Sequence, residues 1–187
     1  PRFANQAKEA GVGILSLSGG VVADDFDGDG WIDLMTSDWA ADGQLRWFRN
    51  TTQGTFADQT DTSGLTGIFG GLNLVQADFD NDGDVDVLVL RGAWRGTAGR
   101  IFNSLLRNDG SGHFVDVSFE TGIATEAFPT QTAAWADYDN DGDLDLFVGN
   151  ESFPSQLFQN DGAGHFVDVA RQAGVTNDRF TKGCTWG

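Results

Sequence analysis

The sequence predicts an all-β fold, a β-propeller of four-stranded antiparallel blades, from three observations. The first is an internal repeat with a period of just over fifty residues. The second is a pattern of four short apolar segments, joined by glycine-containing turns, in each repeat. The third is an aspartate-rich loop that occurs at the same place in three repeats. Four antiparallel strands per unit at this period describe a propeller blade better than a solenoid coil.

Two independent landmarks set the period. Four segments align without gaps: RFANQAKEAGV at 2–12, TFADQTDTSGL at 55–65, HFVDVSFETGI at 113–123 and HFVDVARQAGV at 165–175. Their phenylalanines are 53, 58 and 52 residues apart, at Phe3, Phe56, Phe114 and Phe166. The aspartate-rich loops are 53 and 59 residues apart, beginning at Asp25, Asp78 and Asp137. The chain is therefore a tandem array.

The third unit shows the expected strands most clearly. One apolar segment (132–136) leads into the aspartate-rich loop and a second (144–150) leaves it. A third (155–160) and a fourth (164–170) are joined by DGAG, which is typical of a hairpin turn. The second unit repeats this pattern with DGSG, whereas the first has RNTTQGTFADQT and lacks the NDGxG turn.

We expect residues 1–187 to form one partial propeller domain of roughly three and a third blades. A ring of this kind usually has about four to eight blades, so these blades cannot close it. Either the native chain continues beyond both ends, or other chains complete the ring; we favour the first. The expected parts are the end of a preceding blade (1–12), three repeats (13–65, 66–123 and 124–175) and the first strand of a further blade (176–187).

Composition and charge exclude several classes of partner and structure for this chain. The net charge of -17 argues against nucleic acid and anionic membranes as partners. No run approaches the ~20 apolar residues of a membrane span, so no membrane insertion is expected. The hydrophobic fraction of 40% is enough for a core, so the chain is not a disordered acidic tail. The single cysteine, Cys184, excludes an internal disulfide and is either a buried thiol or the partner of a cysteine elsewhere.

The three loops have the spacing of a calcium site. Aspartates at loop positions 1, 3, 5 and 9, a glycine at 6 that permits a sharp turn, and the backbone carbonyl at 7 together surround one point. Oxygen ligands without His or Cys select a hard cation, and Ca²⁺ tolerates this flexible geometry better than Mg²⁺. The expected ligands are Asp25, Asp27, Asp29, Trp31 (carbonyl) and Asp33; Asp78, Asp80, Asp82, Asp84 (carbonyl) and Asp86; and Asp137, Asp139, Asp141, Asp143 (carbonyl) and Asp145.

The loops differ from an EF-hand, because position 12 is Thr36, Val89 or Val148 and strands flank the loop. Trp31 stands where the other loops have aspartate, so the side chain at position 7 is expected to point away from the ion. A solvated acidic turn is the alternative, but three copies in one register argue against it. Four carboxylates repel one another without a cation, so we interpret all three ions as structural.

The stretches DFDNDGDVDVLVL, DYDNDGDLDLFVGN and LFQNDGAGHFVDVARQAGV resemble FG-GAP/VCBS repeats. They are most similar to those of bacterial secreted proteins related to cartilage acidic protein, which often carry an ASPIC/UnbV domain further on. The resemblance covers essentially the whole chain. It implies an integrin-α-like propeller, usually of about seven blades, with Ca²⁺ in loops on one rim.

The histidines, the insertion at 91–104 and two glycosylation sequons indicate a function less specifically than the loops do. His113 and His165 occupy equivalent turn positions and are interpreted as surface residues; no nucleophile motif accompanies them, so no enzyme is expected. The insertion at 91–104 is the leading candidate for a contact surface, although a solvated loop with one packed tryptophan also explains it. Asn50-Thr51-Thr52 and Asn150-Glu151-Ser152 match the glycosylation sequon.

The sequence therefore predicts an extracellular, calcium-binding module for adhesion or for binding a protein or carbohydrate ligand. Two alternatives stay open. One is a subunit that assembles with other copies through open blade edges. The other is a non-catalytic scaffold of a polysaccharide-active enzyme.

Overall fold

A computed structural model describes residues 3–186 and contains three four-stranded antiparallel sheets. Each sheet lies within one predicted repeat, and its strands follow one another in chain order from one edge to the other, which confirms the predicted all-β fold. The first sheet has β1 (Ser18–Asp24), β2 (Asp33–Asp38), β3 (Arg46–Asn50) and β4 (Phe56–Asp58). The second has β5 (Asn73–Ala77), β6 (Asp86–Leu90), β7 (Ser104–Asn108) and β8 (Phe114–Asp116). The third has β9 (Thr130–Ala136), β10 (Asp145–Asn150), β11 (Gln156–Asn160) and β12 (Phe166–Asp168).

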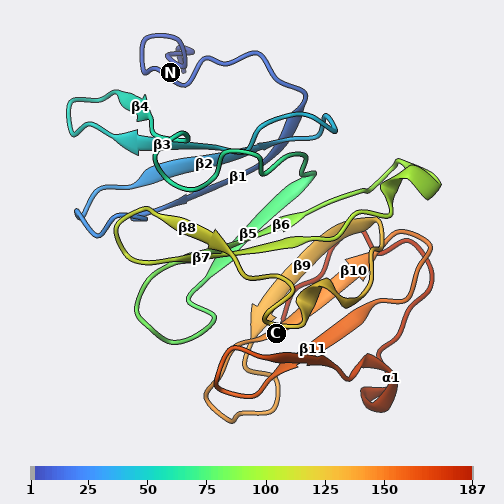
Figure 1. Cartoon of the computed structure of the whole chain (residues 1–187). Helices are drawn as coiled ribbons and strands as arrows, with labels where there is room; N and C mark the ends of the chain where they lie inside the picture. The colour runs from blue at the N-terminus through green and yellow to red at the C-terminus, as the bar shows by residue number, and fades with distance from the viewer. Residues whose placement is uncertain (1–2, 187) are drawn as a thin grey trace.

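The sheets are arranged as successive propeller blades (Figure 1). The first strand of each sheet contacts the first strand of the next, β1 against β5 and β5 against β9. Gly20 allows β1 and β5 to approach closely, because a Cβ atom at this position would lie 2.5 Å from the Leu74 nitrogen. The remaining structure is short: 3₁₀ helices η1 (Gly96–Gly99) and η2 (Ile123–Thr125), and helix α1 (Ala170–Ala173). Within residues 3–186, no helix has the length and apolar character needed to cross a membrane.

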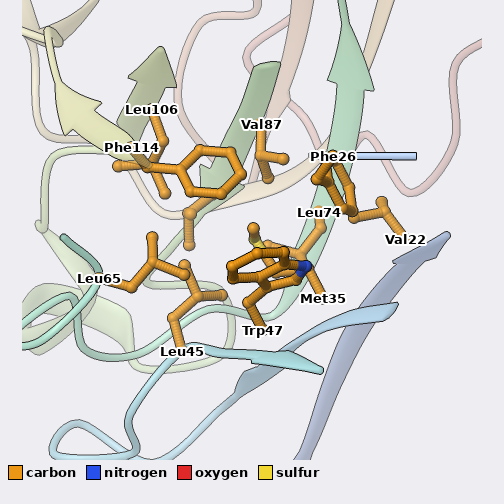
Figure 2. Close-up of a cluster of buried hydrophobic side chains, with 11 residues drawn as sticks. Val22, Phe26, Met35, Leu45, Trp47, Leu65, Leu74, Val87, Leu106 and Phe114 are labelled. Atoms are coloured by element: carbon orange, nitrogen blue, oxygen red, sulfur yellow. The ribbon is translucent and has the colours of Figure 1, made fainter. Parts of the chain in front are cut away.

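The apolar core lies between neighbouring blades. One buried cluster joins the first and second sheets, and Figure 2 shows Phe26, Trp47 and Phe114 packed together within it. The Phe26 and Phe114 rings meet edge to face, with centroids 5.9 Å apart. A second cluster joins the second and third sheets through equivalent positions, including Phe79 and Phe166. Because each blade buries one face against the next, the repeats stabilise one another.

The hairpin of the first sheet forms although its turn lacks the NDGxG sequence. Strands β3 and β4 pair from Phe48–Asp58 to Asn50–Phe56. The Thr51 amide donates to the Thr55 carbonyl at 2.9 Å, and Thr52 takes a left-handed backbone with φ 66°. The turn has the same length as the turns of the other two hairpins and keeps the same strand register.

The terminal segments form no strand within residues 3–17 and 176–186, although the sequence assigns parts of both to blade strands. The later segment still lies against the third sheet: Thr181 N donates to Asn150 O at 3.2 Å, and Trp186 Nε1 to Ala134 O at 3.2 Å. Cys184 is half-buried beside Thr132, and burial raises the pKa of its thiol. No second strand pairs with this segment among the described residues, which explains its irregular backbone. Residues 1, 2 and 187 lie outside the described part of the chain.

The loops of each blade fall on two opposite sides. The aspartate-rich loops connect β1 to β2, β5 to β6 and β9 to β10, and they share a side with the β3–β4, β7–β8 and β11–β12 turns. In Figure 1 these lie at the left and lower left, whereas the insertion between β6 and β7 lies at the right. The aspartate-rich loops are therefore well separated from the insertion.

Candidate metal centres

Each aspartate-rich loop folds around the carboxylate of its first residue. That carboxylate accepts hydrogen bonds from the backbone N–H groups at positions 5 and 6, at 2.8–3.1 Å in every loop. The glycine at position 6 has φ between 86° and 100° in the three loops, a conformation that favours glycine. The residues that accept these bonds are Asp25, Asp78 and Asp137. The spacing of the sequence thus produces the same tight turn three times.

The aspartate at position 9 anchors each loop to the sheet. It is the first residue of the second strand and is at most 1% exposed in all three blades. Asp86 accepts the amides of Asn108 at 2.8 Å and Phe79 at 3.1 Å, and Asp145 accepts those of Asn160 and Tyr138. Asp33 accepts the Asn50 amide and the Trp47 indole N–H.

Burial also changes the protonation of these anchors. Desolvation disfavours a charged carboxylate, so it raises the pKa of Asp86 to about 7 and also raises the pKa of Asp33 and of Asp145. Neighbouring aspartates add to this effect, since Asp80 and Asp82 both raise the pKa of Asp86. Holding these carboxylates close together therefore costs free energy, through desolvation and mutual repulsion, and a bound cation would reduce this cost.

The structure brings three carboxylates together in each loop, with one oxygen of each within 4.8 Å of the others. The clusters are Asp25, Asp27 and Asp29; Asp78, Asp80 and Asp86; and Asp137, Asp139 and Asp145. The remaining predicted carboxylate ligands, Asp33, Asp82 and Asp141, lie in the same loops but outside these tightest clusters.

The donor set fits a hard divalent cation. Every side-chain donor is a carboxylate oxygen, which suits Ca²⁺ or Mg²⁺ rather than a softer metal. One of them is otherwise unexplained, because Asp80 Oδ1 is buried and has no hydrogen-bond partner. Burial and Asp82 together raise the pKa of this carboxyl group. An unpaired buried oxygen inside a carboxylate cluster is a position that a cation would satisfy.

The side chains at position 7 lie outside all three clusters. Trp31 is 51% exposed. Asp143 instead accepts a hydrogen bond from Asn81 Nδ2 at 2.9 Å, so it joins the third loop to the second. Asp84 is likewise absent from the cluster of its loop. The backbone carbonyl at position 7 stays the predicted ligand atom of these residues.

Sequence reasoning missed three asparagines that hold the loops in place. Asn50, Asn108 and Asn160 end the third strand of each blade, and their backbone amides donate to the position 9 aspartates. The Asn108 side chain also donates to Phe26 O at 2.8 Å and Val85 O at 3.2 Å, so it joins the loops of two blades. Asn160 does the same with Phe79 O and Leu144 O. The signal was present, because all three repeats carry asparagine at this position.

The residue before each asparagine distinguishes the three centres. In the first blade, Arg49 donates to both Asp27 and Asp29, the second at 2.6 Å. The hydrogen bond to Asp27 raises the pKa of Arg49. In the second blade Arg107 acts on Asp80 only through its charge, which opposes the rise in the pKa of that group. In the third, the neutral Gln159 donates to Asp139 Oδ2 at 2.6 Å.

The other residues that the sequence singled out, the two histidines and the two sequons, do not belong to the clusters. His113 and His165 are exposed in their hairpin turns, and His165 Nδ1 lies 3.5 Å from Asp161. Asn150 of the second sequon is fully buried, and its Nδ2 donates to Pro154 O at 2.8 Å. A glycan on this nitrogen would disrupt the fold, whereas Asn50 is only half-buried.

Comparison with protein families gives one match. A family model described as FG-GAP-like repeat matches residues 25–89 and 93–148, which together make up more than half of the chain. The first matched range begins directly after β1 and has an aspartate-rich loop at each end, whereas the second begins in the insertion after β6 and has one at its C-terminal end. No curated protein matches the chain.

Proposed function

The chain belongs to the FG-GAP-like repeat family, and from this premise we propose that it is a calcium-stabilised β-propeller module that binds ligands outside the cell. The proposed ions are three, one in each aspartate-rich loop. The observation that carries the calcium proposal is the triple occurrence of a carboxylate cluster, with the unpartnered Asp80 oxygen in the second. Calcium is favoured over magnesium because the donors come from a flexible loop rich in protein oxygens.

The role proposed for the ions is structural. A bound Ca²⁺ supplies positive charge that offsets the repulsion between carboxylates. The residues of this chain supply the rest: the position 1 aspartate shapes the loop, and the position 9 aspartate ties it to the second and third strands. Binding to the folded but not the unfolded chain adds to stability, by about 2.7 kcal/mol per site at a hundredfold excess over Kd.

The proposed setting is extracellular, and the proposed role is adhesion or ligand binding without catalysis. Calcium is millimolar outside cells, which suits loop sites of moderate affinity. Support for ligand binding comes from the side of the blades opposite the aspartate-rich loops. There the sheets present long loops, such as the insertion between β6 and β7.

Thermal unfolding with and without calcium tests the proposal. EDTA is expected to lower the Tm by roughly 20 °C, since three sites together contribute on the order of 8 kcal/mol. Added CaCl₂ is expected to restore the Tm, and MgCl₂ at the same concentration to restore much less. A Tm that EDTA leaves unchanged would contradict a structural role for calcium, and equal rescue by magnesium would contradict the choice of ion.

A further inference from the structure

The insertion between β6 and β7 is positively charged, although the protein as a whole is acidic. Residues 87–108 contain four arginines and no acidic residue, although the chain carries a net charge of -17. Among residues 3–186, neither Arg95 nor Arg100 has a carboxylate within ion-pair distance. Their charges are therefore available to a ligand.

A buried arginine fixes the base of this loop. Arg91 is 7% exposed and donates to Phe69 O at 2.8 Å, Phe102 O at 3.1 Å and Ser104 Oγ at 2.6 Å. Above it, the backbones of Gly92 and Gly99 touch, since a Cβ atom on Gly92 would lie 1.9 Å from Gly99 O. Because the two ends of the segment 93–98 are in contact, these residues form a compact loop.

The loop also contacts both neighbouring blades. Trp39 of the first blade donates from Nε1 to Ala93 O at 3.1 Å. On the other side, Thr130 N donates to Arg91 O at 2.8 Å, and the Trp94 amide donates to the Glu151 carboxylate. Loop residues are thus held by all three blades before any ligand binds, which reduces the entropy lost on binding.

Aromatic rings lie beside the free arginines. The Arg95 guanidinium lies 5.0 Å from the centre of the Trp39 ring, and that of Arg100 lies 5.9 Å from the centre of Phe153. Trp94 is 58% exposed and has φ 63°, an uncommon backbone conformation for a bulky residue. We call these five residues, Trp39, Trp94, Arg95, Arg100 and Phe153, the arginine–aromatic surface.

We propose that the arginine–aromatic surface binds an acidic polysaccharide, one that carries carboxylates on its sugar rings. The proposal rests on the ligand-binding function proposed above and names the surface and the ligand class. A guanidinium group pairs with a carboxylate through two parallel hydrogen bonds, and stacking on an aromatic ring holds its plane. An exposed indole such as that of Trp94 offers a flat apolar face on which the C–H side of a sugar ring packs.

Two other features disfavour an acidic peptide. This part of the surface is built from loops, so it offers no free strand edge to which a peptide backbone could pair. The cavity beside Arg91 and Arg95 has a volume of only about 60 Å³, too small to receive a large apolar side chain. A charged surface of aromatic rings and guanidinium groups, held by all three blades, suits a chain of sugar rings better.

Calorimetric titration with hyaluronan octasaccharide, in millimolar calcium, tests the proposal. The matched ligand is the carboxyl-reduced octasaccharide, which keeps the sugar rings and lacks the charges. We expect wild-type protein to bind the acidic form and to bind the reduced form at least about tenfold more weakly. R95Q/R100Q is expected to lose about tenfold or more in affinity, and W94A about fivefold or more. R171Q, which removes an exposed arginine of α1, is the control and is expected to bind as wild type does.

Several outcomes would overturn the proposal. Equal binding by R95Q/R100Q, with an unchanged Tm, would show that the saccharide binds elsewhere and that this surface is not used. Binding of an octaglutamate peptide but not of the saccharide would assign the surface to a protein partner. Absence of saccharide binding, with a Tm that still responds to EDTA, would refute this inference and leave the calcium proposal intact. A Tm that EDTA leaves unchanged would refute the calcium proposal instead.

Discussion

The first and third aspartate-rich loops have the same backbone turn but different surrounding charges. Both wrap around the carboxylate of their first aspartate with the same hydrogen bonds. The third loop holds five aspartates beside the neutral Gln159, whereas the first holds four beside Arg49. One carboxylate fewer and one guanidinium more make the first centre two charge units less negative. The loop sequence thus determines the geometry of a site, while a neighbouring strand adjusts its charge.

The two blades also differ in how the loop is supported. Asn160 of the third blade reaches the loop of the second, whereas the Asn50 side chain donates only to Ile32 O of its own loop. No sheet precedes β1 among residues 3–186. The third centre is therefore both more negative and more firmly held.

The largest expected effect comes from removing the asparagine that joins two blades. N160A would leave two carbonyl groups without a donor at a position that is 3% exposed, at a cost of about 3 kcal/mol. N50A is expected to cost about 1 kcal/mol, because it removes one donated bond and the acceptor of the Thr52 amide at a half-buried position, where water can replace both. Urea unfolding of the two variants measures the difference. Equal losses would show that the contact between blades adds nothing to the loop support.

Removing one ligand carboxylate is expected to have the next largest effect. Asp139 accepts only the Gln159 side chain, so D139N mainly tests its role in metal binding. It is expected to abolish binding at one site and about 2.7 kcal/mol of the calcium-dependent stability. D27N is expected to lose less, because the first centre is less negative and is expected to bind calcium more weakly.

The matched control is D143N, which lies in the same loop but outside the cluster. Its calcium stoichiometry, measured by titration calorimetry, is expected to stay at three. A D143N variant that bound only two ions would show that this carboxylate is itself a ligand.

The smallest effect is expected from exchanging the neighbouring residues of the two centres. R49Q gives the first centre the residue of the third and is expected to raise its calcium affinity about fivefold, or about 1 kcal/mol after solvent screening. Q159R is expected to lower the affinity of the third centre by a similar factor. R46Q serves as the control, because Arg46 pairs with Asp58 at 2.7 Å instead of with the loop. If both exchanges changed affinity in the same direction, charge would not be the cause of the difference.

Local patterns explain how much of the site was predictable. The spacing of Asp137, Asp139, Asp141 and Gly142 encodes its own turn, because the carboxylate and the amides it accepts are at most five residues apart. The position 7 side chains lie outside the clusters, and this was also predictable, since Trp31 cannot coordinate through its side chain. The contacts of Arg49 with Asp27 and Asp29 span about twenty residues, and nothing in the loop sequence indicates them.

The sequence by itself determined the repeat, the strand order within each blade and the carboxylates of each loop. These follow from periodicity and short-range hydrogen bonding, which depend on residues close together in the chain. Only the tertiary structure decided which side chains meet across blades, as Asn160 meets Phe79 and Trp39 meets Ala93. Such contacts join residues more than fifty positions apart. They depend on how one sheet packs on the next, and that packing is fixed by the whole buried core and not by any local pattern.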